Sequence, residues 1–273
     1  ISFPGIKPGQ TFTYEFPIRQ SGTYWYHSHS GLQEQSGHYG PMIIDPAGAE
    51  PVQFDRDYIL LLSDFTVLDP HFIMSRLRTG EGYFNRQLSS WTDNYPMSGE
   101  ERRMWAEMRM PATDIMDIGA PTYTFLANGR GPNEGLEYLF RAGERVRLRV
   151  INGSAMTAYW IDLGAATGRL VATDGDLCQP LAASRFALAP AQRLEIEIDL
   201  PPGNAAVPVL ALREGGRERT GLILAPTGAS VSRIDPMADA AHPAVSTDLA
   251  QEAQLRALAP LTDRPLDRGL MMM

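Results

Sequence analysis

The chain has 273 residues, of which 44% are hydrophobic and 21% charged, so it is globular and long enough for one or two hydrophobic cores. A formal net charge of −8 and the lack of a basic block argue against nucleic acid or an anionic membrane as a partner. No apolar run is long enough for a transmembrane segment. The single cysteine, Cys178, excludes an internal disulfide.

The first predicted elements belong to an incomplete β-domain. Residues 10–18 alternate between apolar and polar side chains, which is typical of a half-buried antiparallel strand. Its apolar face would carry Phe12, Tyr14, Phe16 and Ile18. Residues 23–29 are β-branched and aromatic and predict a second strand, and residues 42–44 a third. Because a sandwich usually needs about seven strands, we interpret residues 1–46 as the end of a β-domain that begins outside this chain.

His27 and His29 lie two positions apart in the second of these strands, on the same face as Trp25. Their Cβ atoms should be about 6.5–7 Å apart. That spacing is wide for chelation of one small ion, but each ring could reach one of two neighbouring ions, and imidazole suits copper, zinc, iron or nickel. A satisfied or surface histidine pair is the alternative, because the spacing alone is weak evidence.

A second β-domain is predicted over residues 58–226, after a short polar linker. Short strand-like segments separated by Gly, Pro and Asn turns predict a sandwich. They cover residues 58–65, 123–128, 137–140, 145–152, 158–163, 169–173, 193–200, 207–212 and 220–225. Period-two patterns place Val146, Leu148 and Val150 inward, and likewise Leu194, Ile196 and Ile198, with charged residues on the opposite face.

An insertion of mixed character interrupts this domain at about residues 68–120. Its helical signals include a capping box that begins at Ser98, and Met104 and Met108 share a helical face. Residues 227–273 shift to Ala, Pro and Asp with little periodicity, apart from a possible short helix over residues 246–257. We interpret them as a linker toward a further domain.

The stretch 22–45, GTYWYHSHSGLQEQSGHYGPMIID, resembles the first-domain copper motif of the multicopper oxidases, and most of all their copper-resistance protein A type. The segments YTFLANG, LFRAGERVRLRVINGSAMT and LVATDGDLCQPL resemble the second domain of that type. The resemblance implies an all-β fold of cupredoxin-like Greek-key sandwich domains. It further implies a periplasmic enzyme that takes electrons from Cu(I) or a phenol-like donor and reduces dioxygen to water.

Within that resemblance, His27 and His29 each ligate one copper of a type 3 pair. The family's complete cluster needs several HxH pairs and a type 1 site with an HCH motif, whereas this chain has five histidines and one such pair. The remaining ligands are therefore expected outside this chain, in a second HxH pair before Ile1 and in a third domain after Met273, and the chain alone should be inactive. Cys178, without neighbouring histidines, is expected to be a buried apolar residue.

Several other residues allow two interpretations. Glu34 and Gln35 follow the motif and are hypothesised to orient a histidine or relay protons, with a plain turn as the alternative. His38 is expected to be exposed or to support a ligand, and His71 and His242 to have no metal role. A methionine-rich stretch could bind Cu(I) or fill a core. Its members are Met97, Met104, Met108, Met110 and Met116, with Met271, Met272 and Met273 at the end of the chain.

Two functions of other classes compete with the oxidase. A copper-free cupredoxin-fold scaffold would need no ligands, and a methionine-based copper-binding module would not use the histidine pair. Loss of copper binding after replacement of both histidines would separate these three possibilities.

Overall fold

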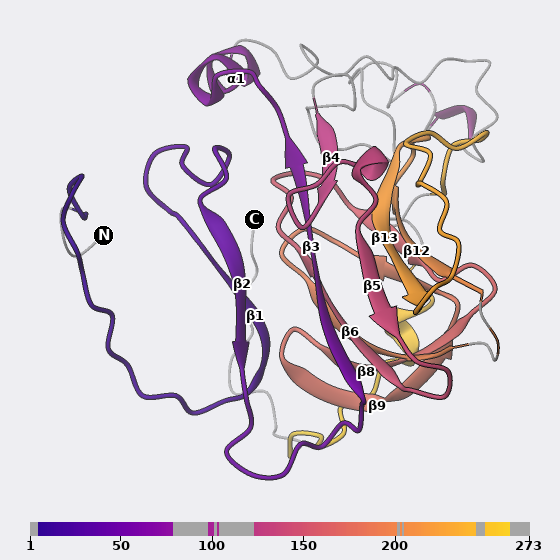
Figure 1. The fold of residues 1–273 in the computed structure, drawn as a ribbon. Helices are drawn as coiled ribbons and strands as arrows, with labels where there is room; N and C mark the ends of the chain where they lie inside the picture. The colour runs from indigo at the N-terminus through magenta and orange to yellow at the C-terminus, as the bar shows by residue number, and fades with distance from the viewer. Residues whose placement is uncertain are drawn as a thin grey trace.

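The computed structural model describes residues 5–78, 98–100, 103, 123–200, 203, 205–243 and 249–262. A two-sheet β-sandwich forms the main body (Figure 1). The six-stranded sheet has the order β4-β3-β6-β11-β8-β9, and the five-stranded sheet has the order β10-β7-β12-β13-β5. The first sheet contains β3 (Arg56–Phe65), β4 (Thr124–Ala127), β6 (Val146–Asn152), β8 (Thr167–Thr173), β9 (Asp176–Ala183) and β11 (Arg193–Asp199). The second contains β5 (Glu137–Phe140), β7 (Tyr159–Asp162), β10 (Arg185–Leu188), β12 (Val207–Arg213) and β13 (Arg219–Pro226).

The core lies between these two sheets and is built from the inward-facing side chains of their strands. Leu60, Leu148, Ile161, Ile196 and Leu224 are completely buried there. Burial of each such side chain contributes roughly 1.5–3 kcal/mol before chain entropy is subtracted. The predicted all-β class is confirmed.

Every strand predicted between residues 58 and 226 is present, with ends within two residues of the expected ones. The strands β9 and β10 were not predicted. β9 contains Pro180, which lacks a backbone N–H, and it lies at the edge of its sheet. Edge strands tolerate proline because one side of their backbone needs no partner. Pro180 is therefore compatible with β9 as an edge strand.

A two-stranded hairpin lies outside the sandwich and packs on its six-stranded sheet. It consists of β1 (Gly22–His27) and β2 (Tyr39–Ile44), with His27 opposite Tyr39. β1 contacts β6 and β11, so the hairpin covers the sheet face that points away from the core (Figure 1). The predicted strand over residues 23–29 ends at His27, where the chain turns into a loop that leads to β2.

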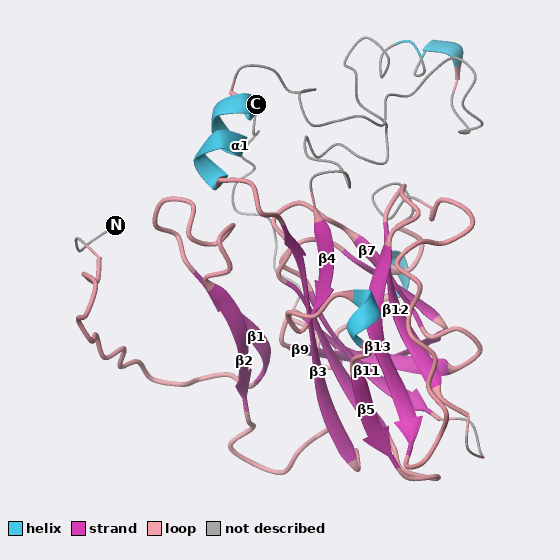
Figure 2. Cartoon of the chain, turned by 45° about the horizontal axis from the view of Figure 1, so that its top comes forward, coloured by secondary structure: helices cyan, strands magenta, loops and turns pink. Residues whose placement is uncertain are grey.

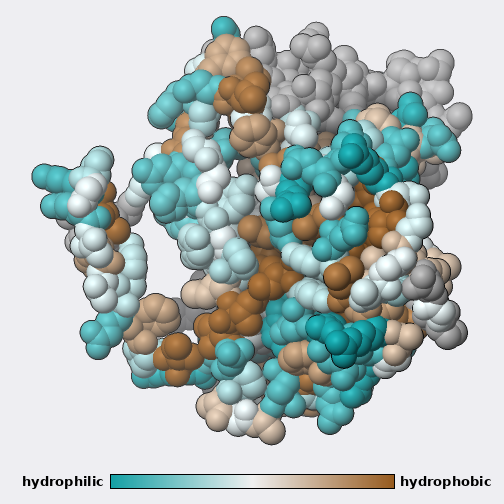
Figure 3. Space-filling model, in the orientation of Figure 1, coloured by the Kyte–Doolittle hydropathy of each residue, from teal (hydrophilic) through white to brown (hydrophobic). Residues whose placement is uncertain are grey.

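The strand predicted over residues 10–18 is wrong. These residues form no strand and are exposed, and the N-terminal segment stands away from the sandwich in the ribbon and space-filling views (Figures 1–3). Alternation alone does not make a strand, because each extended backbone N–H and C=O also needs a partner. Among the segments that the structure describes, no strand pairs with residues 10–18.

The insertion begins with α1 (Pro70–Leu77), which lies ahead of the helical signals identified at residues 98–108. Asp69 caps this helix by accepting a hydrogen bond from the Phe72 backbone N–H, and Pro70 occupies the first turn. Of the predicted capping box, residues 98–100 are described, with residues 99 and 100 helical, whereas Glu101 and the methionines of the methionine-rich stretch lie outside the described residues. In the part of the chain that is described, no helix has the length and apolarity to cross a bilayer.

Two described parts of the segment predicted as a linker, residues 227–243 and 249–262, contact the sandwich. Ile234 is buried, the indole of Trp160 donates to the Pro243 carbonyl, and Ala257 bridges to Cys178 on β9. The predicted helix over residues 246–257 is reduced to a 3₁₀ turn, η2 (Glu252–Gln254), with residues 244–248 not described. The three terminal methionines also lie outside the described residues.

Candidate metal centre

Three aromatic rings stack along one side of the hairpin. The Trp25 and His27 rings have centroids 4.2 Å apart and are nearly parallel, at 13°. The His27 and His29 centroids are 4.5 Å apart, at 39°. The strand alternation predicted this common face. His29 lies beyond the end of the strand, and its ring still lies on the same side as the other two.

A carboxylate lies beside the inner histidine. Glu34 Oε2 is 3.0 Å from His27 Nδ1, with the side chains 35% and 26% exposed respectively. The two atoms are close enough for an ion pair. They do not meet the geometric criteria of a hydrogen bond, so Nδ1 has no hydrogen-bond partner. We therefore interpret the contact as electrostatic. A carboxylate at Nδ1 favours a proton on that nitrogen, which leaves the lone pair of Nε2 for a metal.

The loop between β1 and β2 returns Glu34 to this position. The Ser28 hydroxyl donates to the Gln33 side-chain oxygen at 2.7 Å, and the His38 backbone N–H donates to the Gln33 carbonyl at 3.0 Å. Gly37 adopts a φ of +95°, which favours glycine, at the point where the chain reverses. The loop thus folds on itself, and the hypothesised orienting role of Glu34 has a structural basis.

Gln35 faces the sandwich instead of the histidines. Its side-chain oxygen accepts a hydrogen bond from the Tyr123 hydroxyl at 3.1 Å, beside β4. Burial raises the pKa of Tyr123, reinforced by the negative charge of Asp64. Tyr123 therefore remains a hydroxyl donor at neutral pH. Gln35 links the histidine loop to the second β-domain.

The other candidates from the sequence do not join the pair. His38 and His71 are exposed, and His242 lies next to Glu214 on the far end of β12. The Cys178 thiol is buried in the sandwich core, contacts the Leu170 carbonyl at 3.6 Å and has a pKa raised by burial. The interpretation of Cys178 as a buried structural residue fits these surroundings.

The donor set fits copper in part. Two neighbouring imidazoles, one with a carboxylate at its second nitrogen, are suitable copper ligands. Within the described ranges, no cluster of three or more His, Cys, Asp or Glu side chains could hold a metal by itself. The pair can therefore supply two ligands and needs others to complete a site.

Comparison with known proteins gives the family of the chain. Sequence models described as "Multicopper oxidase" match residues 1–49 and 86–207. Copper resistance protein A of Escherichia coli is 41% identical over 75% of this chain and 35% of its own length. Copper resistance protein A of Pseudomonas syringae pv. tomato is 40% identical over 73% of this chain and 34% of its own length. The chain belongs to the multicopper oxidase family.

The fold agrees with this family. The crystal structure of a multi-copper oxidase from Pseudomonas thermotolerans matches 88% of this chain and 50% of that one, with a TM-score of 0.55 and 21% identity. This multicopper oxidase chain spans about a third of the length of the two copper resistance proteins that it matches.

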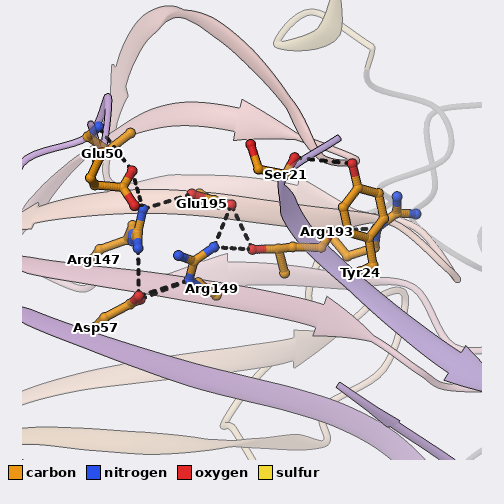
Figure 4. A network of polar contacts seen from close by, with 10 residues as sticks. Ser21, Tyr24, Glu50, Asp57, Arg147, Arg149, Arg193 and Glu195 are labelled. Atoms are coloured by element: carbon orange, nitrogen blue, oxygen red, sulfur yellow. Dashed lines mark hydrogen bonds and ion pairs between the residues drawn. The ribbon is translucent and has the colours of Figure 1, made fainter. Parts of the chain in front are cut away.

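Sequence reasoning missed a buried charged network under β1 (Figure 4). The alternation of β6 and β11 put Arg147, Arg149 and Glu195 on a face away from the core, yet all three are buried. The hairpin covers that face. The signal was present in the sequence, because β6 and β11 carry opposite charges at positions that pair, such as Arg149 with Glu195. Nothing local in the sequence indicated that these charges would be covered.

Proposed function

We propose that this chain contributes His27 and His29 as ligands of a type 3 copper pair in a copper-dependent oxidase. The observation that carries the proposal is the pair of neighbouring imidazole rings with Glu34 beside His27 Nδ1. Membership of the multicopper oxidase family and the two relatives named copper resistance protein A support copper as the metal. When bound, copper would accept electrons and reduce dioxygen to water.

The residues of this chain would hold and orient the metal ligands. Glu34 would keep the His27 proton on Nδ1 and Nε2 free. Trp25 would fix the plane of the His27 ring by stacking and would shield one of its faces from water. His29 would present its ring beside that of His27, so that two neighbouring metals could each take one imidazole.

The wider assignment rests on the family resemblance. We propose that residues 1–46 and 58–226 belong to two cupredoxin-like domains, and that the type 1 site and the other ligands come from a third domain not contained in this chain. Cu(I) or a phenol-like molecule would be the electron donor, and the periplasm the location. The described residues carry only part of such a centre, so the isolated chain should consume no dioxygen when Cu(I) is supplied.

A copper titration tests the ligand assignment. The chain should bind Cu(II) with electron paramagnetic resonance features of nitrogen ligation, and the double variant His27→Ala/His29→Ala should lose that binding. His38→Ala is the matched control, because it removes an exposed imidazole from the same hairpin. Unchanged Cu(II) binding in the double variant would overturn the proposal, and Cu(I) binding that survives in that variant would favour a methionine site. A chain that binds no Cu(II) in either form would favour a copper-free scaffold.

A further inference from the structure

Thr23 joins the buried network from outside the sandwich. Thr23 of β1 is completely buried, and its hydroxyl donates to Glu195 Oε1 at 2.7 Å. The same hydroxyl accepts a hydrogen bond from the Arg149 guanidinium at 2.8 Å. Arg149 also contacts Asp57 at 2.9 Å, so its charge is already balanced within the sandwich. The hydroxyl of Thr23 therefore lies between the charged side chains of Arg149 and Glu195, and we call this site the charged slot.

The residues on either side of Thr23 are fixed as well. A Cβ on Gly22 would lie 2.7 Å from the Gly175 carbonyl oxygen, so only glycine fits against that turn. The guanidinium of Arg193 lies over the ring of Tyr24, with 5.5 Å to the ring centroid, and its Nε donates to the Thr23 carbonyl (Figure 4). Three consecutive residues of β1 thus have three different and non-interchangeable sites on the sandwich.

This arrangement specifies the register of β1. A shift by one residue would move the strand by about 3.3 Å and turn each side chain to the opposite face. It would also bring either Gly22, which has no hydroxyl, or Tyr24, whose hydroxyl lies at the far end of a ring, into the place of the small Thr23 side chain. The shift would leave Glu195 and Arg149 paired with each other but without their hydrogen bonds to the Thr23 hydroxyl. A buried polar group that loses its hydrogen-bond partner costs about 1–3 kcal/mol.

His27 ends the same strand, and His29 follows two residues later. From Thr23 to His27 the strand extends about 13 Å, at about 3.3 Å per residue. A tilt of about 5° around Thr23 would move the His27 ring by about 1 Å, whereas metal ligands need placement within about 0.5 Å. The contact of Gln35 with Tyr123 holds the loop at the other end. The hairpin is therefore fixed on the sandwich at both ends, with the two imidazoles between.

We propose that Thr23, Arg149 and Glu195 are positioning residues for the His27–His29 pair, which they do not touch. This inference rests on the proposed function, in which the two histidines are metal ligands. The contacts that place β1 on the sandwich do not involve copper. The charged slot sets the register and tilt of β1, and β1 carries His27 to its place.

The test replaces the hydroxyl with a methyl group. Thr23→Val keeps the shape and removes both hydrogen bonds, and Thr23→Ser restores the hydroxyl. Thr220→Val is the matched control, because Thr220 is equally buried and its hydroxyl has no hydrogen-bond partner in the structure. All four proteins are compared as full chains without metal and then titrated with Cu(II).

Without metal, Thr23→Val should shift the NMR resonances of the His27 and His29 rings and accelerate amide hydrogen exchange in β1 at least tenfold. Thr23→Ser should restore most of the wild-type values, and Thr220→Val should leave them unchanged. Unchanged histidine resonances and exchange in folded Thr23→Val would overturn the inference, whether or not copper binds. A Thr23→Val chain that fails to fold is replaced by Glu195→Gln, to which the same criteria apply.

With metal, Thr23→Val should bind Cu(II) about tenfold more weakly, while Thr23→Ser remains within about twofold of the wild type. Wild-type affinity in folded Thr23→Val would also overturn the inference. If the wild-type chain does not bind Cu(II), the proposed function fails, and the metal-free measurements still decide the positioning role. The two proposals can thus fail independently.

Discussion

Replacement of Arg149 by methionine should be among the most destabilising single changes in the sandwich. The side chains of Arg149 and Glu195 are 4% and 6% exposed, with 2.9 Å between their charged atoms. Loss of one partner from a buried ion pair typically costs about 3–5 kcal/mol, because the other charge remains buried. Arg147 still contacts Glu195 at 3.7 Å and Asp57 at 2.6 Å and would compensate in part. We therefore expect a loss of about 3 kcal/mol, at the lower end of that range.

Urea unfolding of the full chain at neutral pH measures this loss, with thermal unfolding as a second probe. A loss of that size should lower Tm by about 6–12 °C for a domain of this size. The double variant Arg149→Met/Glu195→Leu should recover at least about 1 kcal/mol relative to the sum of the single changes. Arg56→Met, which breaks the solvent-exposed contact with Glu144, is the control and should have far less effect. Equal effects of Arg149→Met and Arg56→Met, or strict additivity in the double variant, would refute the reasoning.

Three further predictions test other buried features of the chain. Burial raises the pKa of the Cys178 thiol, so iodoacetamide at about pH 8 should modify it only after urea unfolds the protein; rapid modification of the folded chain would contradict its place in the core. Burial lowers the pKa of His242, so the folded state binds that proton less tightly than the unfolded state. The contribution of His242 to stability is complete above about pH 6.5 and is lost as the pH falls below that value. His242→Phe should therefore flatten the dependence of Tm on pH between about 7 and 5. An unchanged slope would exclude His242 as the cause of the pH dependence. Gly22→Ala, with a φ of +133° and a Cβ placed against Gly175, should cost about 1–3 kcal/mol by urea unfolding, whereas Gly48→Ala, which has open space, should cost little; equal effects would show that the close approach at Gly22 is not needed.

The strands of the sandwich were predictable because their pattern has a local cause. Along β11, Leu194, Ile196 and Ile198 alternate with charged residues, and the core side of a sheet requires that alternation. The same rule failed at residues 10–18, where the alternation is equally clear but no described strand supplies hydrogen-bond partners. Period-two patterns report which face would be buried, and only the tertiary arrangement decides whether a sheet exists.

The histidine pair was predictable from the motif, whereas its support was not. The HxH spacing predicted that His27 and His29 lie on one side, and the hypothesis for Glu34 came from its place in the following loop. The contacts of Thr23 with Glu195 and of Gln35 with Tyr123 span 172 and 88 residues of sequence. Such distant contacts arise when the hairpin packs on the sandwich, and no property of the local sequence identifies the partners.

The polar contact between the hairpin and the sandwich determines the position of β1 more than it determines the stability of the fold. An apolar interface of the same size would hold β1 at least as strongly, because buried ion pairs often contribute less than well-packed hydrophobic residues. It would, however, accept neighbouring registers at small cost, since apolar side chains of similar volume replace one another easily. A slot between Arg149 and Glu195 accepts only a hydroxyl at one position. Arg149→Met should therefore lower stability strongly, whereas Thr23→Val should mainly displace the histidine rings. A chain in which both changes affect only stability would show that the charges serve folding and not the placement of the metal ligands.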